Sequence, residues 1–359
     1  MGIAKFGCGN VMRTPVLMFC LMASVALISA TTPVLAHGDH GGGGDTTVLP
    51  PGVALVSLQY DVTSYNPISD ARLTALAVAG VDGVHSLRTI AVPSLGLAYG
   101  LSKDLTIAAR LPYLANSDIR ETDSGLPGIT PRGGVYGFGD ASVTGTYRFY
   151  NDVHNGVEAA VVLGVKAPTG RTDVVDRFGA QFETEHQPGS GSWDALVGGS
   201  LARQAGLWSF GANMLYARAG AGSQDTRLGD HFRISASATY RLWSDAGISH
   251  SAMRMGGDFD GMMHHGGVNH APEPAANSGS TKSLDLSLSL EGQWFGRQTI
   301  AGEGDGNTGG ALAFLTPGVH LNIDKWSWFG NVGIPVARQL NGIQSEPRLQ
   351  ASTGVSVRF

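Results

Sequence analysis

One stretch of the chain gathers most of the side chains that could bind a metal. A thioether is a soft ligand that favours monovalent copper or silver, imidazole suits divalent copper, and carboxylates add oxygen ligands. We therefore predict a copper or silver site here and no obligatory cofactor. A Gly-rich loop whose composition drifted is the alternative, because His-rich tracts are compositional evidence only. Between Ser244 and Lys282 the candidate ligands are His250, Met253, Met255, Asp258, Asp260, Met262, Met263, His264, His265 and His270.

Groups with the spacing of a catalytic centre are not evident. A lipase or acyltransferase site on a barrel needs a Ser or Asp beside a His. The Gly189–Ser192 stretch lacks the apolar strand that leads into a nucleophile elbow. His154 falls in a predicted turn and His186 in a predicted loop, while the isolated His231 and His320 are interpreted as structural. We predict that the protein is not an enzyme.

The N-terminus has the pattern of a secretory signal peptide. Lys5 and Arg13 precede an apolar run at Val16–Ile28, and Val34-Leu35-Ala36 has the small-x-small form of a cleavage site. We predict a signal peptide at residues 1–36, removed near Ala36; an anchoring helix is the alternative. Both cysteines lie in this segment, so the mature chain would carry no thiol. Residues 37–52 then form a flexible tail in which His37 and His40 could hold a metal loosely.

The composition favours an all-β chain. Its 359 residues include 52 glycines, only 15% are charged, and the net charge is −5, which argues weakly against nucleic acid as a partner. After the signal peptide, no segment approaches the roughly twenty apolar residues of a membrane helix. Alternation is clear instead: Leu105, Ile107 and Leu111 share one face of a predicted strand and Arg110 lies on the other. Such runs of about ten residues suit tilted strands that cross a bilayer.

Residues 53–359 therefore predict a transmembrane antiparallel up-and-down β-barrel of about twelve strands. Short and long connections alternate, and the long ones include predicted exposed loops at Asn116–Gly137 and Pro168–Gly191. If the first strand runs outward, the inserted 244–282 loop faces the periplasm. A soluble sandwich is the alternative, because alternation alone does not distinguish lipid from core.

Aromatic and charged side chains follow this pattern. Aromatic residues near strand ends predict interfacial girdles: Tyr60, Tyr99, Tyr113, Tyr147, Phe149, Trp193, Trp208, Tyr216, Tyr240, Trp243, Trp294 and Trp328. Charges on the other face predict a lumen lining, either along a pathway or as a salt-bridged plug that fills a small barrel: Arg110, Arg148, Glu158, Lys166, Asp194, Arg233, Arg241, Asp285 and Glu291.

Several segments give the chain a resemblance to a known family. They are Leu97–Ile107, Leu111-Pro112-Tyr113, Gly137-Phe138-Gly139-Asp140-Ala141, Lys166-Ala167-Pro168-Thr169-Gly170 and Val355-Ser356-Val357-Arg358-Phe359. With them the chain resembles a Gram-negative outer-membrane β-barrel of the family for the MetA-pathway of phenol degradation. The terminal Phe is similar to the signal read by the barrel-assembly machinery, which the resemblance implies as a partner together with outer-membrane lipid.

The family resemblance implies a porin-like protein of the cell outer membrane that passes small, often hydrophobic, compounds. The His/Met-rich loop adds the expectation that the barrel serves copper or silver handling or efflux, with a small molecule or a metal ion as substrate. Two alternatives remain open at this point: a metal-binding protein for which the barrel is only an anchor, and a soluble periplasmic metal-binding β protein.

Overall fold

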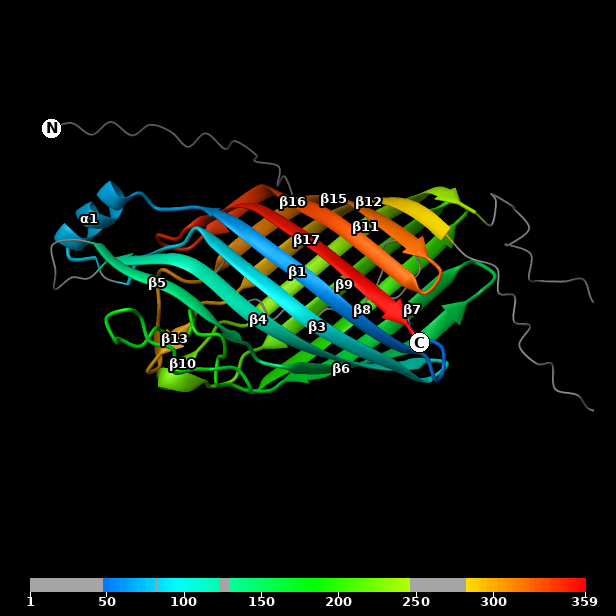
Figure 1. Ribbon diagram of the computed structural model, residues 1–359, viewed down its shortest axis with the longest axis horizontal. Helices are drawn as coiled ribbons and strands as arrows, with labels where there is room; N and C mark the ends of the chain where they lie inside the picture. The colour runs from blue at the N-terminus through cyan, green and yellow to red at the C-terminus, as the bar shows by residue number, and fades with distance from the viewer. Residues whose placement is uncertain (1–47, 82, 123–128, 246–281) are drawn as a thin grey trace, which may run out of the picture.

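Twelve long antiparallel strands close into a barrel in the described part of the chain (Figure 1). The structure is a computed structural model that describes residues 48–81, 83–122, 129–245 and 282–359. The barrel strands are β1 Ala54–Asn66, β3 Thr89–Ser102, β4 Leu105–Thr122, β6 Ser142–Asp152, β7 Val157–Lys166, β8 Asp194–Ala205, β9 Trp208–Arg218, β11 His231–Ser244, β12 Lys282–Phe295, β15 Gly310–Ile323, β16 Trp326–Leu340 and β17 Glu346–Arg358.

The wall has the predicted up-and-down order. Each barrel strand pairs antiparallel with the next barrel strand along the chain. The first and last strands, β1 and β17, close the ring, with Tyr60 opposite Thr353. Closure pairs the backbone groups that an open sheet would leave at its two edges, as a hydrocarbon environment requires. The predicted barrel of about twelve strands is confirmed.

The two faces of the wall differ as the alternation predicts. Large apolar side chains point outward and stay exposed, as Leu95, Leu97 and Leu288 do on β3 and β12. Inward positions carry buried polar groups such as Thr106 and Asp285. An outer face of this kind is stable only against lipid, so the wall is that of a transmembrane barrel and not of a soluble sandwich.

Aromatic side chains gather toward both rims of the wall. Trp208 and Trp243 are exposed near the short turns, and Trp193 and Trp294 are exposed near the other ends of their strands. Trp208 stacks on Phe210, with ring centroids 6.2 Å apart. Amphipathic rings at these positions match the two interfaces of a bilayer.

The predicted exposed loop at Asn116–Gly137 is wrong over most of its length. β4 continues to Thr122 and pairs with β5, which spans Ile129–Phe138, so a hairpin extends past the point where β4 leaves β6. The sequence is polar and lacks clear alternation, but Ile119 and Val135 are buried in an apolar cluster. Tertiary packing therefore supports strands that the local pattern does not predict.

Smaller elements gather beside this hairpin. They are the helix α1 at Asp70–Val78, the short strands β2 His85–Ser86, β10 Thr226–Arg227, β13 Thr299–Ile300 and β14 Glu303–Gly304, and the 3-10 turn η1 at Ser223–Asp225. Ser69 caps α1 by accepting a hydrogen bond from the Arg72 backbone N–H at 3.3 Å. Leu73 and Leu76 lie on the buried face of α1. No helix among the described residues is long and apolar enough to cross a membrane.

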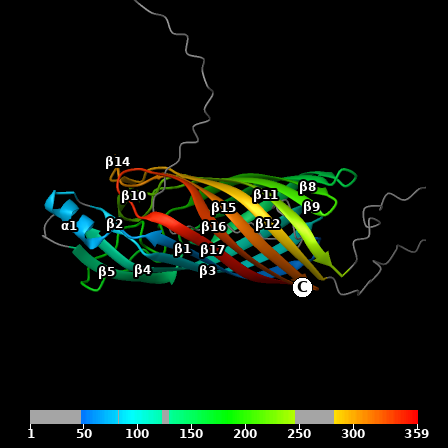
Figure 2. The ribbon, with the colours of Figure 1, turned by 90° about the horizontal axis from the view of Figure 1, so that it is seen from above.

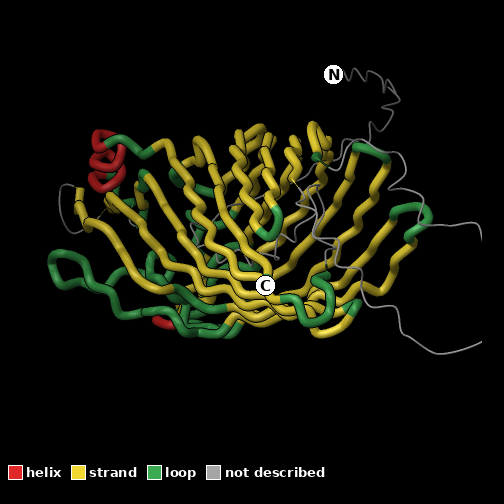
Figure 3. Tube along the Cα trace, turned by 45° about the vertical axis from the view of Figure 1, so that its right-hand side comes forward, coloured by secondary structure: helices red, strands yellow, loops and turns green. Residues whose placement is uncertain are grey.

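The barrel has two distinct ends. α1, β2, β5 and β10 lie at one end, which we call the long-loop end, and the C-terminus lies at the opposite, short-turn end (Figures 1 and 2). In the tube view, α1 lies at a distance from the short turns between neighbouring strands (Figure 3). Ser244 and Lys282, which flank the His/Met-rich segment, end their strands at the short-turn end, where the Asp245 backbone N–H donates to the Lys282 carbonyl at 3.1 Å.

Substituting Leu288→Arg tests the lipid-facing wall. Leu288 is 50% exposed at the middle of β12, where an arginine faces hydrocarbon and costs about 2–4 kcal/mol of unfolding free energy. Leu101→Arg is the matched control, because Leu101 is equally exposed near a short turn, where the cost is about 0–1 kcal/mol. Urea unfolding in lipid vesicles measures the unfolding free energy of both variants. Equal losses of unfolding free energy would contradict the placement of Leu288 in the hydrocarbon and of Leu101 near the interface.

Candidate functional site

The connection between β7 and β8, residues 167–193, enters the barrel. We call it the β7–β8 loop. Its Phe182 is 1% exposed and packs in a cluster with Ile90 and Val92 of β3 and Val135 of β5. Ile90 and Val92 lie on the face of β3 opposite to Leu95 and Leu97, which point to lipid. Phe182 is therefore on the inner side of the wall, and the loop occupies the lumen near the long-loop end.

The loop also lies along the edge of β5 that does not face β4. The Arg171 backbone N–H donates to the Phe138 carbonyl at 3.3 Å. Farther along β5, the Arg132 guanidinium donates to the Gln181 carbonyl at 2.9 Å and lies over the Phe182 ring, 5.2 Å from its centroid. The loop thereby covers a strand edge that leaves the barrel wall, as a protected edge requires.

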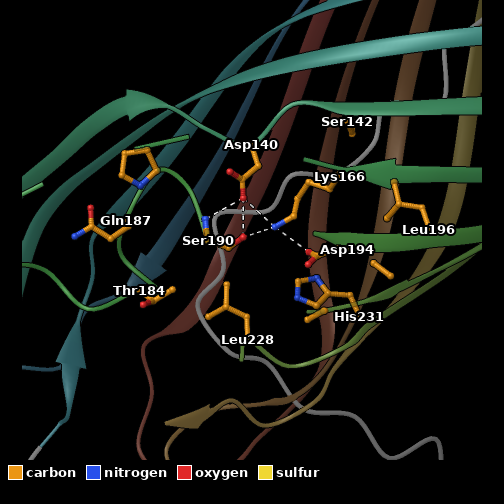
Figure 4. A pocket seen from close by; sticks show the side chains of 13 residues that line it. Asp140, Ser142, Lys166, Thr184, Gln187, Ser190, Asp194, Leu196, Leu228 and His231 are labelled. Atoms are coloured by element: carbon orange, nitrogen blue, oxygen red, sulfur yellow. Dashed lines mark hydrogen bonds and ion pairs between the residues drawn. The ribbon is translucent and has the colours of Figure 1, made fainter. Parts of the chain in front are cut away.

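A buried ammonium group holds the base of the β7–β8 loop. Lys166 Nζ, at the end of β7, lies 2.9 Å from Asp140 Oδ2 and 2.8 Å from Asp194 Oδ2. It also donates to Ser190 Oγ at 2.5 Å (Figure 4). One positive charge thus lies between two carboxylates, all with little solvent contact. Removal of such a charge leaves the carboxylates unpaired in a poorly solvated site.

Asp140 connects this ion pair to the loop backbone. Its carboxylate accepts hydrogen bonds from the Gly170 N–H at 3.0 Å and the Ser190 N–H at 2.9 Å. Gly170 lies so close to Gly139 and Gly189 that an added Cβ would meet their backbone atoms at 2.7 and 2.6 Å. The two family-like motifs, residues 137–141 and 166–170, therefore form one structural unit, which their separation in sequence does not reveal.

A small cavity lies beside Lys166. Its volume is about 40 Å³, room for a few water molecules at roughly 10–15 Å³ each but not for an organic molecule. Leu196, Leu228 and His231 contribute to its lining (Figure 4). This cavity beside Lys166 is therefore a site for water and not for a substrate.

Ser190 and Lys166 have the contact of a serine–lysine pair but not its chemistry. Such a pair needs a neutral amine that accepts the hydroxyl proton. Here Asp140 and Asp194 both contact the ammonium and stabilise its charged form, and the Ser190 hydroxyl itself donates to Asp140 at 2.7 Å. The arrangement is suited to fixing a loop, and the absence of enzymatic activity stays a prediction.

The predicted lumen charges lie in ion pairs where the structure gives their contacts. Arg110 lies 3.2 Å from Asp61, a partner that the sequence did not indicate. Arg241 lies 2.8 Å from Asp285. The remaining predicted charges are placed as follows: Arg148 contacts Glu158 and Asp104, Lys166 contacts Asp194, and Arg233 and Glu291 are half-buried on β11 and β12. Their role in a pathway stays a prediction.

The predicted metal ligands fall outside the described residues. This applies to His37 and His40, and to every candidate from His250 to His270. Among the residues that the structure describes, a different set of donors meets at the long-loop end, formed by His85 of β2 with Glu183, Glu185 and His186 of the β7–β8 loop. The sequence Glu183-Thr184-Glu185-His186 was a signal for this set, but its partner lies far earlier in the chain.

Burial sets the protonation of this cluster, which lies beyond the part of the wall where β4 pairs with β6. Burial, then the charge of His85, hold the pKa of His186 well below its usual value. Burial also lowers the pKa of His85, but contacts with Glu121 and Glu185 outweigh it and raise that pKa well above its usual value. Burial raises the pKa of Glu183 to about 7. One imidazole is therefore charged and the other neutral.

The closed wall, the apolar outer face and the aromatic rims define a transmembrane β-barrel of the outer-membrane kind. The profile of the family described as "Putative MetA-pathway of phenol degradation" matches residues 102–254, which confirms the resemblance that the motifs predict. The matched residues contain both motifs that meet at Lys166.

Comparison with solved structures agrees on the fold. An outer membrane channel from Pseudomonas putida F1 is similar, with a TM-score of 0.53 and 14% sequence identity over 90% of this chain and 98% of that chain. LpxR from Salmonella typhimurium is less similar, with a TM-score of 0.39 and 11% identity over 84% of this chain and 99% of that chain. The comparison with curated proteins gives no match.

Substituting Lys166→Met tests the loop anchor. The change leaves Asp140 and Asp194 without their cation, so we expect a loss of about 3–5 kcal/mol of unfolding free energy. Lys103→Met is the control, because the Lys103 side chain is 85% exposed and its removal should cost less than about 0.5 kcal/mol. The temperature at which the folded, fast-migrating gel band disappears reports both effects, and equal temperatures would show that the ion pair contributes nothing.

Proposed function

We propose that the protein is an outer-membrane channel for small, largely hydrophobic molecules, in which the β7–β8 loop forms the constriction. The observation that carries this proposal is the position of Phe182, which packs inside the barrel among apolar residues. Farther toward the short turns, the inward faces are polar and charged. An apolar cluster at the mouth of a polar lumen is the feature that would select the permeating molecule.

The apolar cluster provides a surface for an apolar solute. Besides Phe182 it contains Leu87, Ile90, Val92, Leu114, Ile119 and Val135, all buried. A hydrophobic molecule that displaced Phe182 would keep the contacts of the cluster and leave water, which is favourable. The fold shared with an outer membrane channel and the family described for phenol degradation support a substrate of this kind.

The division of the loop into an anchored base and an apolar tip supports movement at the tip. Lys166, Asp140 and Ser190 fix the base by buried charged contacts. The Phe182 ring is held by non-directional apolar packing and by Arg132, whereas its backbone carbonyl accepts hydrogen bonds from the Gln187 and Gln224 side chains at 2.8 and 3.0 Å, so the movement is that of the ring. Apolar contacts of this kind exchange with a solute of similar polarity, whereas the ion pair does not.

Substituting Phe182→Ala should widen the constriction. We expect a several-fold rise in the rate at which a small aromatic compound enters vesicles that contain the purified protein, because the buried ring is replaced by a methyl group. Phe178→Ala is the matched control, since Phe178 lies in the same loop but is 63% exposed. Equal entry rates for the two variants would contradict the assignment of the β7–β8 loop as the constriction.

A second function is favoured by the place of the His/Met-rich segment. Its flanking residues, Ser244 and Lys282, end strands at the short-turn end, and in outer-membrane barrels short turns face the periplasm. We propose that this segment binds copper or silver through its methionines and histidines and links the barrel to metal handling or efflux. A barrel that serves only as an anchor for this segment is the alternative.

Replacing residues 251–277 by a Gly/Ser linker of equal length separates these functions. We expect lower copper tolerance of cells that carry the variant, with unchanged entry of the aromatic compound, because the strands that flank the replaced segment meet it at the end opposite to Phe182. Copper tolerance and vesicle entry are measured on the same variant. Loss of entry together with tolerance would indicate that the metal ion passes through the same route, and unchanged tolerance would contradict the copper role.

A further inference from the structure

Four donor side chains, three of them buried and Glu183 partly exposed, meet at the long-loop end. One donor atom from each of His85, Glu183, Glu185 and His186 can be chosen so that all lie within 4.8 Å of one another. His85 Nε2 is 3.3 Å from Glu183 Oε2, and His85 Nδ1 is 3.3 Å from Glu185 Oε1. His186 Nε2 is 3.5 Å from the same Glu185 oxygen. Only one of the two His85 nitrogens could bind a given ion, and with one nitrogen chosen the four donors still form a compact group.

Polar atoms in this cluster lack hydrogen bonds. His186 is 2% exposed and Glu185 is 6% exposed. Neither ring nitrogen of His186 makes a hydrogen bond, and neither does Oε2 of Glu185. A buried polar atom without a partner costs about 1–3 kcal/mol, so such atoms are rare in stable structures. Several of them converging in one place indicate a ligand that binds them.

The ion pairs around the cluster suit the binding of a cation. Arg132 lies 3.2 Å from Glu121 and 3.1 Å from Asp176, so these two carboxylates have an arginine beside them. Glu183 and Glu185 contact His85 at 3.3 Å and have no arginine contact among the described residues. Glu121 lies 3.5 Å from His85. A divalent ion would displace the proton of His85, and the two carboxylates would then balance its charge within the cluster.

We propose that His85, Glu183, Glu185 and His186 form a binding site for one divalent first-row transition-metal ion, with Zn²⁺ the best match. Zinc–nitrogen and zinc–oxygen bonds of about 2.0–2.2 Å place tetrahedral ligand atoms roughly 3.3–3.6 Å apart. With one donor atom from each residue, the four donors lie within 4.8 Å of one another, so the side chains would draw closer together when the ion binds. The donor set is nitrogen and oxygen without sulfur, which separates it from the copper or silver site proposed for the His/Met-rich segment.

A metal ion here would join the β7–β8 loop to β2. His85 belongs to β2, which pairs with the end of β4, and the other three ligands belong to the β7–β8 loop. The ion would therefore cross-link the loop to the barrel hairpin, close to Phe182. The binding site itself does not depend on whether the barrel passes small molecules.

Zinc titration of the full-length, chelator-treated protein in detergent tests the site. We expect His186→Asn and Glu185→Gln each to bind one equivalent of Zn²⁺ fewer than the unsubstituted protein. His154→Asn is the control, because His154 is exposed in the turn between β6 and β7 and should leave the stoichiometry unchanged. The difference in stoichiometry separates this site from zinc held by the other histidine-containing segments.

Two further measurements test whether a loss of zinc binding is caused by misfolding of the variant. The heat-dependent shift in gel mobility shows whether each variant still forms the barrel, and His85→Gln replaces any variant that does not. Zinc X-ray absorption should show nitrogen and oxygen neighbours at this site, and Zn²⁺ should raise the unfolding temperature of the unsubstituted protein more than that of the variants. Equal stoichiometry and equal shifts for the folded variants and the unsubstituted protein would overturn the proposal.

Discussion

A single buried ammonium, that of Lys166, is the contact on which the interior of this barrel depends. It lies between Asp140 and Asp194, and Asp140 in turn accepts hydrogen bonds from the backbone of Gly170 and Ser190. The cost of removing three charges from water is offset only while all three stay together, so the ends of β7 and β8 and the start of their loop are fixed as one unit. The tip of the loop is thereby directed to the inner side of the wall.

The position of the loop follows from the departure of β5 from the wall. β4 pairs first with β6 and then with β5, so the other edge of β5 is left without a neighbouring barrel strand. The β7–β8 loop covers that edge and places Phe182 among the inward residues of β3, β4 and β5. One segment thus protects a strand edge and narrows the lumen, which links the stability of the barrel to the passage that we propose for it.

The two metal sites that we propose would have different chemistries. The His/Met-rich segment is flanked by strands that end at the short-turn end, and its thioethers suit soft monovalent ions. The cluster of His85, Glu183, Glu185 and His186 lies at the long-loop end and offers only nitrogen and oxygen donors. A metal bound at the second site would act on the constriction, whereas one bound at the first would meet the periplasm.

Alternation of apolar and polar residues by itself determined the wall: the strands and their approximate number follow from a period of two that each segment carries locally. That the apolar face meets lipid was decided by the closed barrel, which leaves that face exposed. The motifs likewise predicted the resemblance to the family whose profile matches residues 102–254. Only the tertiary structure decided that the polar stretch after Asn116 forms a hairpin, that Phe182 enters the lumen, and that His85 meets Glu185 and His186. These features depend on contacts between residues far apart in the chain, in segments without periodic signal, where packing and charge rather than local pattern select the conformation.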